Sequence, residues 1–343
     1  MQFADLNISN TMLQILLINL PLLLLSIGFL WKGSEWLVES ASSIATTFGI
    51  SDLVIGLTVV AIGTSAPEFA VTTIAVLTGK NDISVSNVVG SNIFNLGFIL
   101  GGTACIRAIT TSPKLVYRDG TFLISVTVLL AMFLFGPTQL YHFLIGDTTY
   151  QGSPLVLTAL EGGTMMTLLT IYMLFLFFKR EQVDGGDISH EKAGWKAYLM
   201  LLIGIAGVVG GGHLLVESAS AIAKAFGVSD WVIGVTIVAA GTSAPELATS
   251  LMAVIKDKHG MAAGNLIGSD LFNLLGVLGL AGILGSPLEV SSEAQGSMII
   301  LIAMVTLVIF FMRTGWRVSR LEGAILVVIN LVRWIADFSS KSH

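Results

Sequence analysis

Apolar runs, separated by short charged or glycine- and proline-rich joints, follow one another along almost the whole chain. A helix needs about 20 mainly apolar residues to cross a bilayer, and most of these runs are that long or longer. The pattern predicts an all-α integral membrane protein with about ten transmembrane helices. The first and sixth runs are long enough to tilt strongly or to extend past the bilayer. The predicted spans are 13–46, 52–78, 83–106, 119–136, 154–178, 195–225, 230–255, 261–284, 296–312 and 318–338.

The composition fits burial in lipid rather than in water. Of the 343 residues, 54% are hydrophobic and only 11% are charged, and the mean hydropathy is +0.86. A soluble domain carries about 25% charged residues. Cys105 is the single cysteine, which excludes an intrachain disulfide and a cysteine-based metal cluster. No basic patch with interleaved aromatic residues is present, so we expect no nucleic-acid partner, and we expect no cofactor.

Basic residues are divided unequally between the two sides of the predicted membrane. When the joints are assigned to alternating sides, one side collects twelve Lys or Arg residues and the other collects four. Because basic loops stay in the cytoplasm, the bias places both termini outside, in a plasma membrane. The twelve are Arg107, Lys114, Arg118, Lys179, Arg180, Lys192, Lys196, Lys256, Lys258, Arg313, Arg317 and Arg320, and the four are Lys80, Lys224, Arg333 and Lys341.

Two segments of the chain, 37–101 and 215–279, repeat each other. At an offset of 178 they align without a gap, and 36 of 65 positions are identical. The repeating unit is about five helices, and an odd number inverts the second copy in the membrane. Inverted repeats are typical of secondary transporters, whose substrate site lies near the midplane. The predicted organisation is a first five-helix repeat over 1–180, a cytoplasmic linker over 181–194 and a second, inverted repeat over 195–343.

Each repeat carries the sequence Gly-Thr-Ser-Ala-Pro-Glu in the middle of a span, at 63–68 and at 241–246. Proline removes a helical donor and clashes with the preceding turn, and the glycine four residues earlier loosens that turn. We therefore expect broken helices at the second and seventh spans. Irregular backbone at membrane depth is tolerated where it lines a cavity, and a hard cation would satisfy its carbonyl groups. The carbonyls expected to be freed are those around Ala61, Thr64, Ala239 and Thr242.

The motif also places Glu68 and Glu246 inside the membrane. An acidic residue there is costly and indicates function. Two carboxylates 4 Å apart repel by about 4 kcal/mol at an effective dielectric of about 20, so protons or cations must neutralise them. Two negative charges match one divalent ion, and Ca²⁺ takes about 6–8 oxygen ligands, including carboxylates and carbonyls. The sequence predicts a calcium site at this pair.

A second motif pair follows, with Ser91 and Asn95 in the first repeat and Ser269 and Asn273 in the second. Residues four apart lie on one helix face. We expect these faces to turn inward and to complete the oxygen cage. The alternative is hydrogen bonding between helices that only stabilises packing.

Two further groups of polar residues are assigned more peripheral places. Asn92 and Asp270 stand one position after the serines, so they are predicted to point away from the inward face and either to support the ligands from outside it or to lie at the membrane interface. Glu35, Glu39 and Glu217 lie in the two long runs. They fit carboxylates at the membrane interface, and the alternative is a part in the ion path.

The paired GTSAPE segments, together with GSNIFN and GSDLFN, resemble the two alpha-repeats of the calcium/cation antiporter superfamily, in its prokaryotic sodium/calcium exchanger branch. The resemblance covers nearly the whole chain. It implies antiport of Na⁺ and Ca²⁺ at a cluster of ion sites at the midplane. It also implies alternating access through sliding of the first and sixth helices.

The resemblance further implies roles for individual residues. The two glutamates would be ligands shared by calcium and sodium, and the other ligands would supply neutral oxygens. These are carbonyl or hydroxyl oxygens of Thr64 and Thr242, carbonyls of Ala61 and Ala239, hydroxyls of Ser65, Ser243, Ser91 and Ser269, and amides of Asn95 and Asn273.

One position departs from a pattern found in the superfamily. Some members carry Asp where this chain has Asn273, so the site is expected to hold two acidic groups rather than three. The departure argues against potassium co-transport and leaves the stoichiometry open. Proton-coupled relatives tend to alter the Thr-Ser-Pro pattern, so the intact motif favours sodium.

Competing interpretations remain on the same residues. The first is a proton/calcium antiporter in which the two glutamates are alternately protonated. An intramembrane hydrolase would need a base within reach of Ser65 or Ser243, and neither motif has a histidine nearby. A passive channel fits poorly with matched broken helices and carboxylates, which favour occlusion. The oligomeric state is not specified by the sequence.

Overall fold

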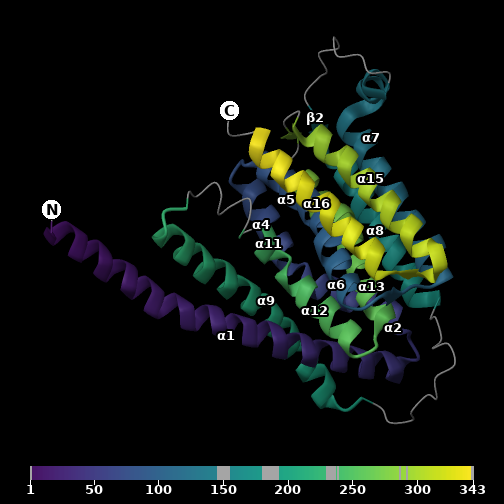
Figure 1. Cartoon of the computed structure of the whole chain (residues 1–343). Coiled ribbons are helices and arrows are strands. Elements are labelled where there is room, and N and C mark those ends of the chain that lie inside the picture. Colours follow the sequence, from purple (N-terminus) through teal and green to yellow (C-terminus); the bar gives the residue numbers. More distant parts are fainter. Residues whose placement is uncertain are drawn as a thin grey trace.

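The computed structural model describes residues 2–144, 155–179, 193–228, 237, 239–285, 287–290 and 293–340. Nearly all of them are helical (Figure 1). In the first half of the chain the elements are α1 (Gln2–Phe48), α2 (Asp52–Ile55), η1 (Gly56–Val60), α3 (Ala61–Thr64), α4 (Ala66–Leu77), α5 (Asn81–Phe94), η2 (Asn95–Leu100), α6 (Gly101–Ile106), β1 (Ile109–Thr110), η3 (Leu115–Gly120), α7 (Thr121–Leu144), β2 (Leu155–Leu157) and α8 (Ala159–Lys179).

The second half follows the same order of long and broken helices. Its elements are α9 (Trp195–Ala225), α11 (Ala239–Thr242), α12 (Ala244–Ile255), α13 (His259–Leu271), η5 (Phe272–Val277), α14 (Leu278–Leu284), β3 (Leu288–Val290), α15 (Glu293–Arg313), η6 (Thr314–Trp316), β4 (Arg317–Val318) and α16 (Arg320–Ser340).

The helices agree with the predicted spans, although they do not establish the count of ten. Within the described residues seven helices are long and apolar enough to cross a membrane, and the bent pair 52–64 and 66–77 brings the number to eight. The predicted span 230–255 is described mainly through α11 and α12, and α16 is helical over the predicted span 318–338. Most of the predicted linker 181–194 lies outside the described residues. The domain boundaries and the seventh and tenth spans therefore stay predictions.

The two halves of the chain interlock through contacts that occur twice. The two-stranded sheets pair β1 with β4 and β2 with β3, so each half contributes one strand to each sheet. Repeat-related glycines also lie where helices of the two halves come into close contact. A Cβ atom at Gly101 would lie 2.8 Å from the carbonyl oxygen of Gly323, and one at Gly279 would lie 3.1 Å from that of Gly162. The corresponding helices of each half thus pack against the other half, which is the arrangement expected of two repeats.

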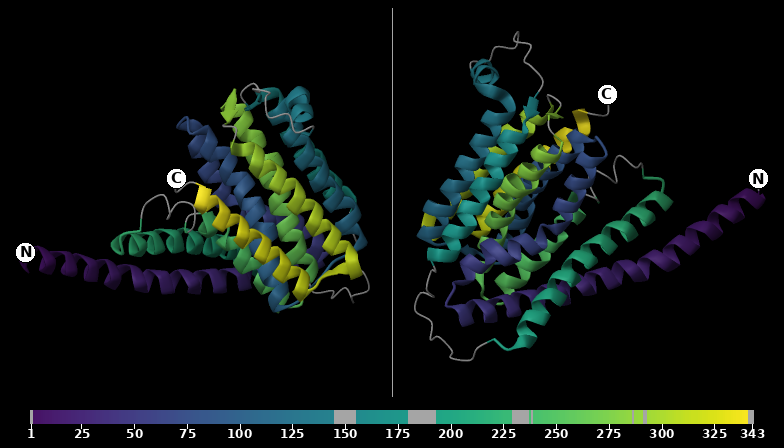
Figure 2. Two further views of the ribbon diagram at one scale, coloured as in Figure 1. Left: turned by 45° about the horizontal axis from the view of Figure 1, so that its top comes forward. Right: turned by 180° about the vertical axis from the view of Figure 1, so that it is seen from behind.

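The two longest helices, α1 and α9, run side by side and obliquely across the rest of the bundle (Figures 1 and 2). Their lengths, 47 and 31 residues, confirm that the first and sixth runs extend beyond a simple span. The contact is made through glycines. A Cβ atom at Gly204 would lie 2.6 Å from the backbone nitrogen of Leu37, and one at Gly33 would lie 2.8 Å from that of Val208. Small residues allow two backbones to approach this closely.

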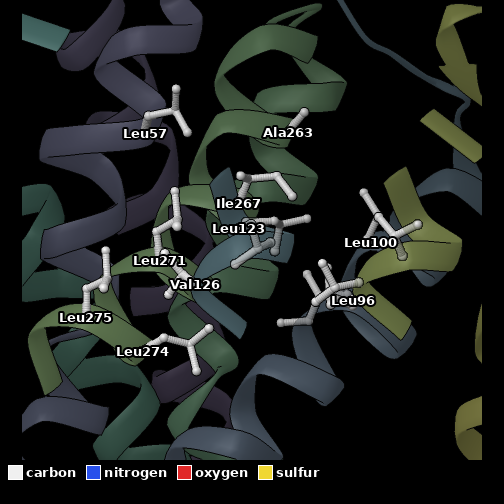
Figure 3. Packing of buried hydrophobic residues seen from close by; sticks show 14 of the residues in the cluster. Leu57, Leu96, Leu100, Leu123, Val126, Ala263, Ile267, Leu271, Leu274 and Leu275 are labelled. Carbon is white, nitrogen blue, oxygen red and sulfur yellow. The ribbon is translucent and has the colours of Figure 1, made fainter. Parts of the chain in front are cut away.

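The remaining helices enclose a hydrophobic core that surrounds α13 and its continuation η5. Leu57, Ile267 and Leu271 are fully buried there, and side chains from η2 and α7 complete the cluster (Figure 3). Three π-helical stretches, η1, η2 and η5, lie in the broken or site-forming spans. Single π-turns inside helices are frequent at functional sites. Residues of η1, η2 and η5 are part of this core, so its packing stabilises the irregular helices.

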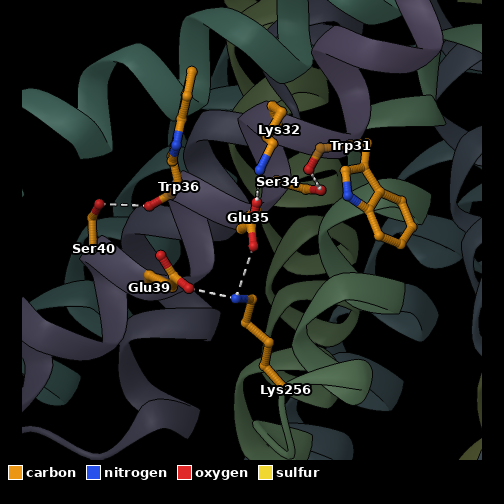
Figure 4. A network of polar contacts seen from close by, with 8 residues as sticks. All are labelled: Trp31, Lys32, Ser34, Glu35, Trp36, Glu39, Ser40 and Lys256. Atoms are coloured by element: carbon orange, nitrogen blue, oxygen red, sulfur yellow. Dashed lines mark hydrogen bonds and ion pairs between the residues drawn. The ribbon is translucent and has the colours of Figure 1, made fainter.

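A group of ion pairs joins α1 to the connection between α12 and α13 (Figure 4). Lys256 contacts the carboxylates of both Glu35 and Glu39, and its Nζ lies 3.2 Å from Glu35 Oε1. The hydrogen bond to Glu39, supported by the one to Glu35, raises the pKa of Lys256 above its ordinary value. The next residues of the same connection pair elsewhere, Asp257 with Arg107 and Lys258 with Asp52. We call the contact of Lys256 with Glu35 and Glu39 the Lys256 clasp.

Candidate functional site

The candidate site lies where the two GTSAPE segments meet. Ser65 separates α3 from α4 and has φ −78° and ψ 8°, and Ser243 separates α11 from α12 with φ −89° and ψ 9°. The proline of each motif occupies the first turn of the following helix. The first pair of helices is bent by 47°. The prediction of broken helices at both motifs is confirmed.

The break does not free the carbonyl of Ala61, contrary to expectation. That oxygen accepts the backbone N–H of Ser65 at 3.0 Å and the Thr64 hydroxyl at 3.3 Å. Helical hydrogen bonding therefore continues through Ala61, and the helix breaks only after Thr64. Proline at position 67 removes instead the donor that would bond to the carbonyl of Gly63 in a regular helix. Ala61 is the least supported of the predicted ligands.

The two glutamates are fully buried, and each is held by a serine of the opposite repeat. The Ser65 hydroxyl donates to Glu246 Oε1 at 3.1 Å, and the Ser243 hydroxyl donates to Glu68 Oε1 at the same distance. The second oxygen of each carboxylate, Oε2, makes no hydrogen bond with the residues that the structure describes. Each carboxylate is thus fixed through one oxygen and leaves the other as an available acceptor.

Further hydroxyl groups surround this crossed arrangement. The Ser91 hydroxyl faces Glu68, and those of Thr64 and Ser269 face Glu246. Thr64 Oγ1 also donates to Asn265 Oδ1 at 3.1 Å and lies 3.4 Å from Ser269 Oγ. Five of the six predicted serine and threonine ligands, namely Thr64, Ser65, Ser91, Ser243 and Ser269, therefore lie beside one of the two carboxylates.

Asn95 and Asn273 lie in the same polar cluster, and their amide orientations are set by hydrogen bonds across the repeats. Asn95 Nδ2 donates to Asp270 Oδ1 at 3.1 Å, and Asn273 Nδ2 donates to Asn92 Oδ1 at 3.1 Å. The oxygen Oδ1 of both asparagines is buried without a hydrogen-bond partner. The alternative that Asn92 and Asp270 lie at the membrane interface is wrong because both are fully buried, whereas each supports a predicted ligand, as the other alternative had it.

That error has a simple geometric origin. The faces were assigned relative to Ser91 and Ser269, but Asn92 stands three residues before Asn95, and residues three apart on a helix are neighbours. The same spacing relates Asp270 to Asn273. A third buried carboxyl group, that of Asp270, therefore lies against Asn95. The expectation that the site itself holds two acidic groups stays a prediction.

Two repeat-related hydrogen bonds join the helices that carry the site residues, α4 to α5 in the first repeat and α12 to α13 in the second. Asn87 Nδ2 donates to the Thr72 hydroxyl at 3.1 Å, and Asn265 Nδ2 donates to the Ser250 hydroxyl at 3.0 Å. Thr72 and Ser250 are fully buried, and the sequence interpretation missed both. The signal was available, because they occupy equivalent positions at the offset of 178 and are both hydroxyl residues.

The chemistry of the site is that of oxygen ligands. Among the described residues no three His, Cys, Asp or Glu side chains are grouped as a metal site would need. The available acceptors are instead Oε2 of the two glutamates and Oδ1 of the two asparagines, supplemented by hydroxyls. Carboxylate, amide and hydroxyl oxygens suit hard cations such as Ca²⁺ rather than transition metals.

Replacing Ser65 or Ser243 by alanine should weaken cation binding by similar amounts. Each change removes one donor to a buried carboxylate, and a hydrogen bond to a charged group contributes about 1.5–3 kcal/mol. We expect a rise of about tenfold or more in the half-saturating concentration of Ca²⁺, measured by equilibrium binding to the purified protein. Strongly unequal effects would contradict the symmetric arrangement. Ser86→Ala is the control, because the Ser86 hydroxyl bonds only to the carbonyl of Ile83 on the exposed side of α5.

Comparisons with known proteins identify the family of this chain. The family model described as sodium/calcium exchanger protein matches residues 18–178 and 196–332. The sodium/calcium exchanger MaX1 of Methanosarcina acetivorans is 32% identical over 353 residues, covering 94% of this chain and 99% of the relative. The inner membrane protein YrbG of Escherichia coli is 30% identical over 335 residues, covering 94% and 97%.

Among solved structures, the sodium-calcium exchanger NCX_Mj has a TM-score of 0.77 at 29% identity, over 92% of this chain and 97% of that chain. The similarity therefore spans both repeats and the site between them. The chain belongs to the sodium/calcium exchanger family of the calcium/cation antiporter superfamily, in its prokaryotic branch, which is a family of membrane antiporters and not of enzymes.

Proposed function

We propose that this protein exchanges Na⁺ for Ca²⁺ across the plasma membrane by alternating access, with Glu68 and Glu246 as ligands shared by both ions. One observation carries the proposal. Each glutamate is anchored through Oε1 by a serine of the other repeat and keeps Oε2 unpartnered. The two half-sites can therefore act together only when the repeats are in contact.

The shared ligands also couple the two fluxes. Because both ions need the same carboxylates, calcium and sodium at full occupancy exclude each other, and the protein changes orientation with one or the other bound. Motion of one part of an inverted-repeat protein against the rest about a fixed central site is the usual form of alternating access. The paired helices α1 and α9 are the part proposed to move. If three Na⁺ exchange for one Ca²⁺, one net charge crosses per cycle, worth about 2.3 kcal/mol per 100 mV.

The proposed membrane orientation follows from the basic residues, with both termini outside. The structure brings several of the predicted cytoplasmic joints to one end of the bundle. Arg107 contacts Asp257 beside Lys256 and Lys258, and β1 pairs with β4. These contacts support the alternating assignment of the joints. Cysteine labelling from each side of the membrane would test it.

The decisive experiment is uptake of calcium-45 into proteoliposomes preloaded with sodium, potassium or choline at fixed pH. We expect uptake only with internal sodium, together with sodium efflux. Uptake that ignores sodium and follows an imposed pH gradient would instead assign the protein to proton-coupled calcium antiport. Empty liposomes give the background, and a calcium ionophore that releases the accumulated ion shows that it was inside.

A further inference from the structure

Asp270 is a buried acidic residue that stands within the GSDLFN motif but outside the proposed ligand set. It lies on α13, is fully buried and accepts a hydrogen bond from Asn95, which belongs to the opposite repeat. Its second oxygen, Oδ2, has no hydrogen-bond partner. It also interacts electrostatically with Glu246. An unpartnered carboxylate oxygen therefore lies inside the polar cluster of the site.

The repeat mate of Asp270 shows which part of its role needs no charge. Asn92 accepts the amide of Asn273 at 3.1 Å, just as Asp270 accepts that of Asn95. An amide nitrogen cannot bind a cation, whereas an amide oxygen can. Holding Nδ2 therefore leaves Oδ1 of each asparagine for the ion. Since a neutral residue orients Asn273, orientation alone does not require an acid at position 270.

The acid brings a charge that nothing nearby balances. Burial of an unpaired carboxylate is costly. No Lys, Arg or His forms an ion pair with Asp270 among the pairs recorded for the described part of the chain. The hydrogen bond from Asn95 and the neighbouring carbonyl contact, in which Asn92 Nδ2 donates to the backbone oxygen of Asp270 at 3.1 Å, add no positive charge. Either a proton or the transported cation must therefore neutralise it, and a cation that binds beside Asn95 would replace the proton.

We propose that Asp270 acts on the cation site through Asn95: it orients that amide and adds a negative charge that increases cation affinity, without joining Glu68 and Glu246 in one ligand group. The inference rests on the proposed function, since it assigns Asp270 a role at the same site. It makes the two halves of the site unequal in charge although they are equal in hydrogen bonding. The extra charge lies on the side of the cluster that Asn95 occupies.

The test separates charge from orientation by exchanging the two repeat mates. Asp270→Asn keeps an acceptor for Asn95 and removes the charge, while Asn92→Asp/Asp270→Asn moves the acid to the opposite repeat. We expect Asp270→Asn to raise the half-saturating Ca²⁺ by about tenfold or more and to leave the maximal rate within about threefold. We expect the exchanged variant to regain most of the lost affinity. Sodium-dependent calcium-45 uptake and equilibrium Ca²⁺ binding are the readouts, on protein that elutes as a single species in detergent.

Two outcomes would overturn the inference. One is a half-saturating Ca²⁺ in Asp270→Asn equal to that of the wild type. The other is a loss in Asp270→Asn that the exchange does not restore, which would assign Asp270 to local packing.

If Asp270→Asn does not fold, Asn92→Asp alone tests the same idea, because an acid at the mirror position should change the half-saturating Ca²⁺ at least about threefold, and no change would refute it. The wild type is measured in parallel. If the wild type shows no sodium-dependent calcium uptake, the proposed function fails. The outcomes named above refute only the role of Asp270.

Discussion

Glutamine in place of Glu68 or Glu246 should abolish calcium transport. Each carboxylate is fully buried, is fixed by a serine of the other repeat and presents one unpartnered oxygen. Glutamine retains the size of the side chain and an oxygen, but it removes one of the charges that balance a divalent ion and places an amide N–H donor among acceptors. We expect at least a hundredfold loss of sodium-dependent calcium uptake, roughly 2.8 kcal/mol at about 1.4 kcal/mol per tenfold.

The control for this pair is Glu289→Gln, an identical chemical change at an exposed position on β3. It should transport as the wild type does. Because the site is formed from both repeats, either single change should be as severe as the double change. Calcium uptake that persists in Glu68→Gln or Glu246→Gln would remove these residues from the shared ligand set. A folded protein should be confirmed by its elution profile and helical circular dichroism.

Alanine in place of Gly204 should separate α1 from α9 and impair both stability and transport. The added Cβ would lie 2.6 Å from the backbone nitrogen of Leu37 and 2.9 Å from the carbonyl oxygen of Gly33. Both are backbone atoms, so no flexible side chain can move aside. Overpacking of this kind costs about 1–3 kcal/mol, and we expect a lower midpoint of thermal unfolding in detergent together with reduced calcium uptake.

Gly210 provides a matched control on the same helix. A Cβ there would meet nothing within 4 Å. Alanine is a better helix former than glycine by about 0.8–1.0 kcal/mol, so Gly210→Ala should leave the midpoint unchanged or raise it. The two substitutions are therefore expected to differ in sign. Equal effects would show that helix propensity, rather than contact between α1 and α9, dominates at both positions.

Much of the site could be predicted because the chain contains the motif twice. The offset of 178 located Glu68 and Glu246, and the glycine–proline spacing predicted the helix breaks that the structure shows. The pairing of Ser65 with Glu246 could not be predicted, since contacts between the halves depend on how the repeats pack. A single sequence gives the contents of each half-site but not their mutual arrangement.

Other errors came from treating the helices as regular. Ala61 was expected to lose its hydrogen bond, yet the helix continues past it to Thr64 before it breaks. Asp270 was assigned to an outer face, although Asn95 binds it across the repeats. π-Helical turns begin at Asn95 and at Phe272, within the second motif of each repeat. A fixed period of 3.6 residues cannot represent such a change of pitch.

The Lys256 clasp makes the two faces of the membrane unequal in a protein whose site is nearly two-fold symmetric. At the offset of 178, Thr78 stands in place of Lys256, and His213 in place of Glu35. Glu217, the counterpart of Glu39, pairs with His213 on its own helix. Perfect repeats would give the two end states of alternating access equal free energies, and a contact available to only one of them biases a two-state equilibrium. For the proposed cycle we therefore expect the two orientations to be unequally populated at rest, even when no ion gradient is present.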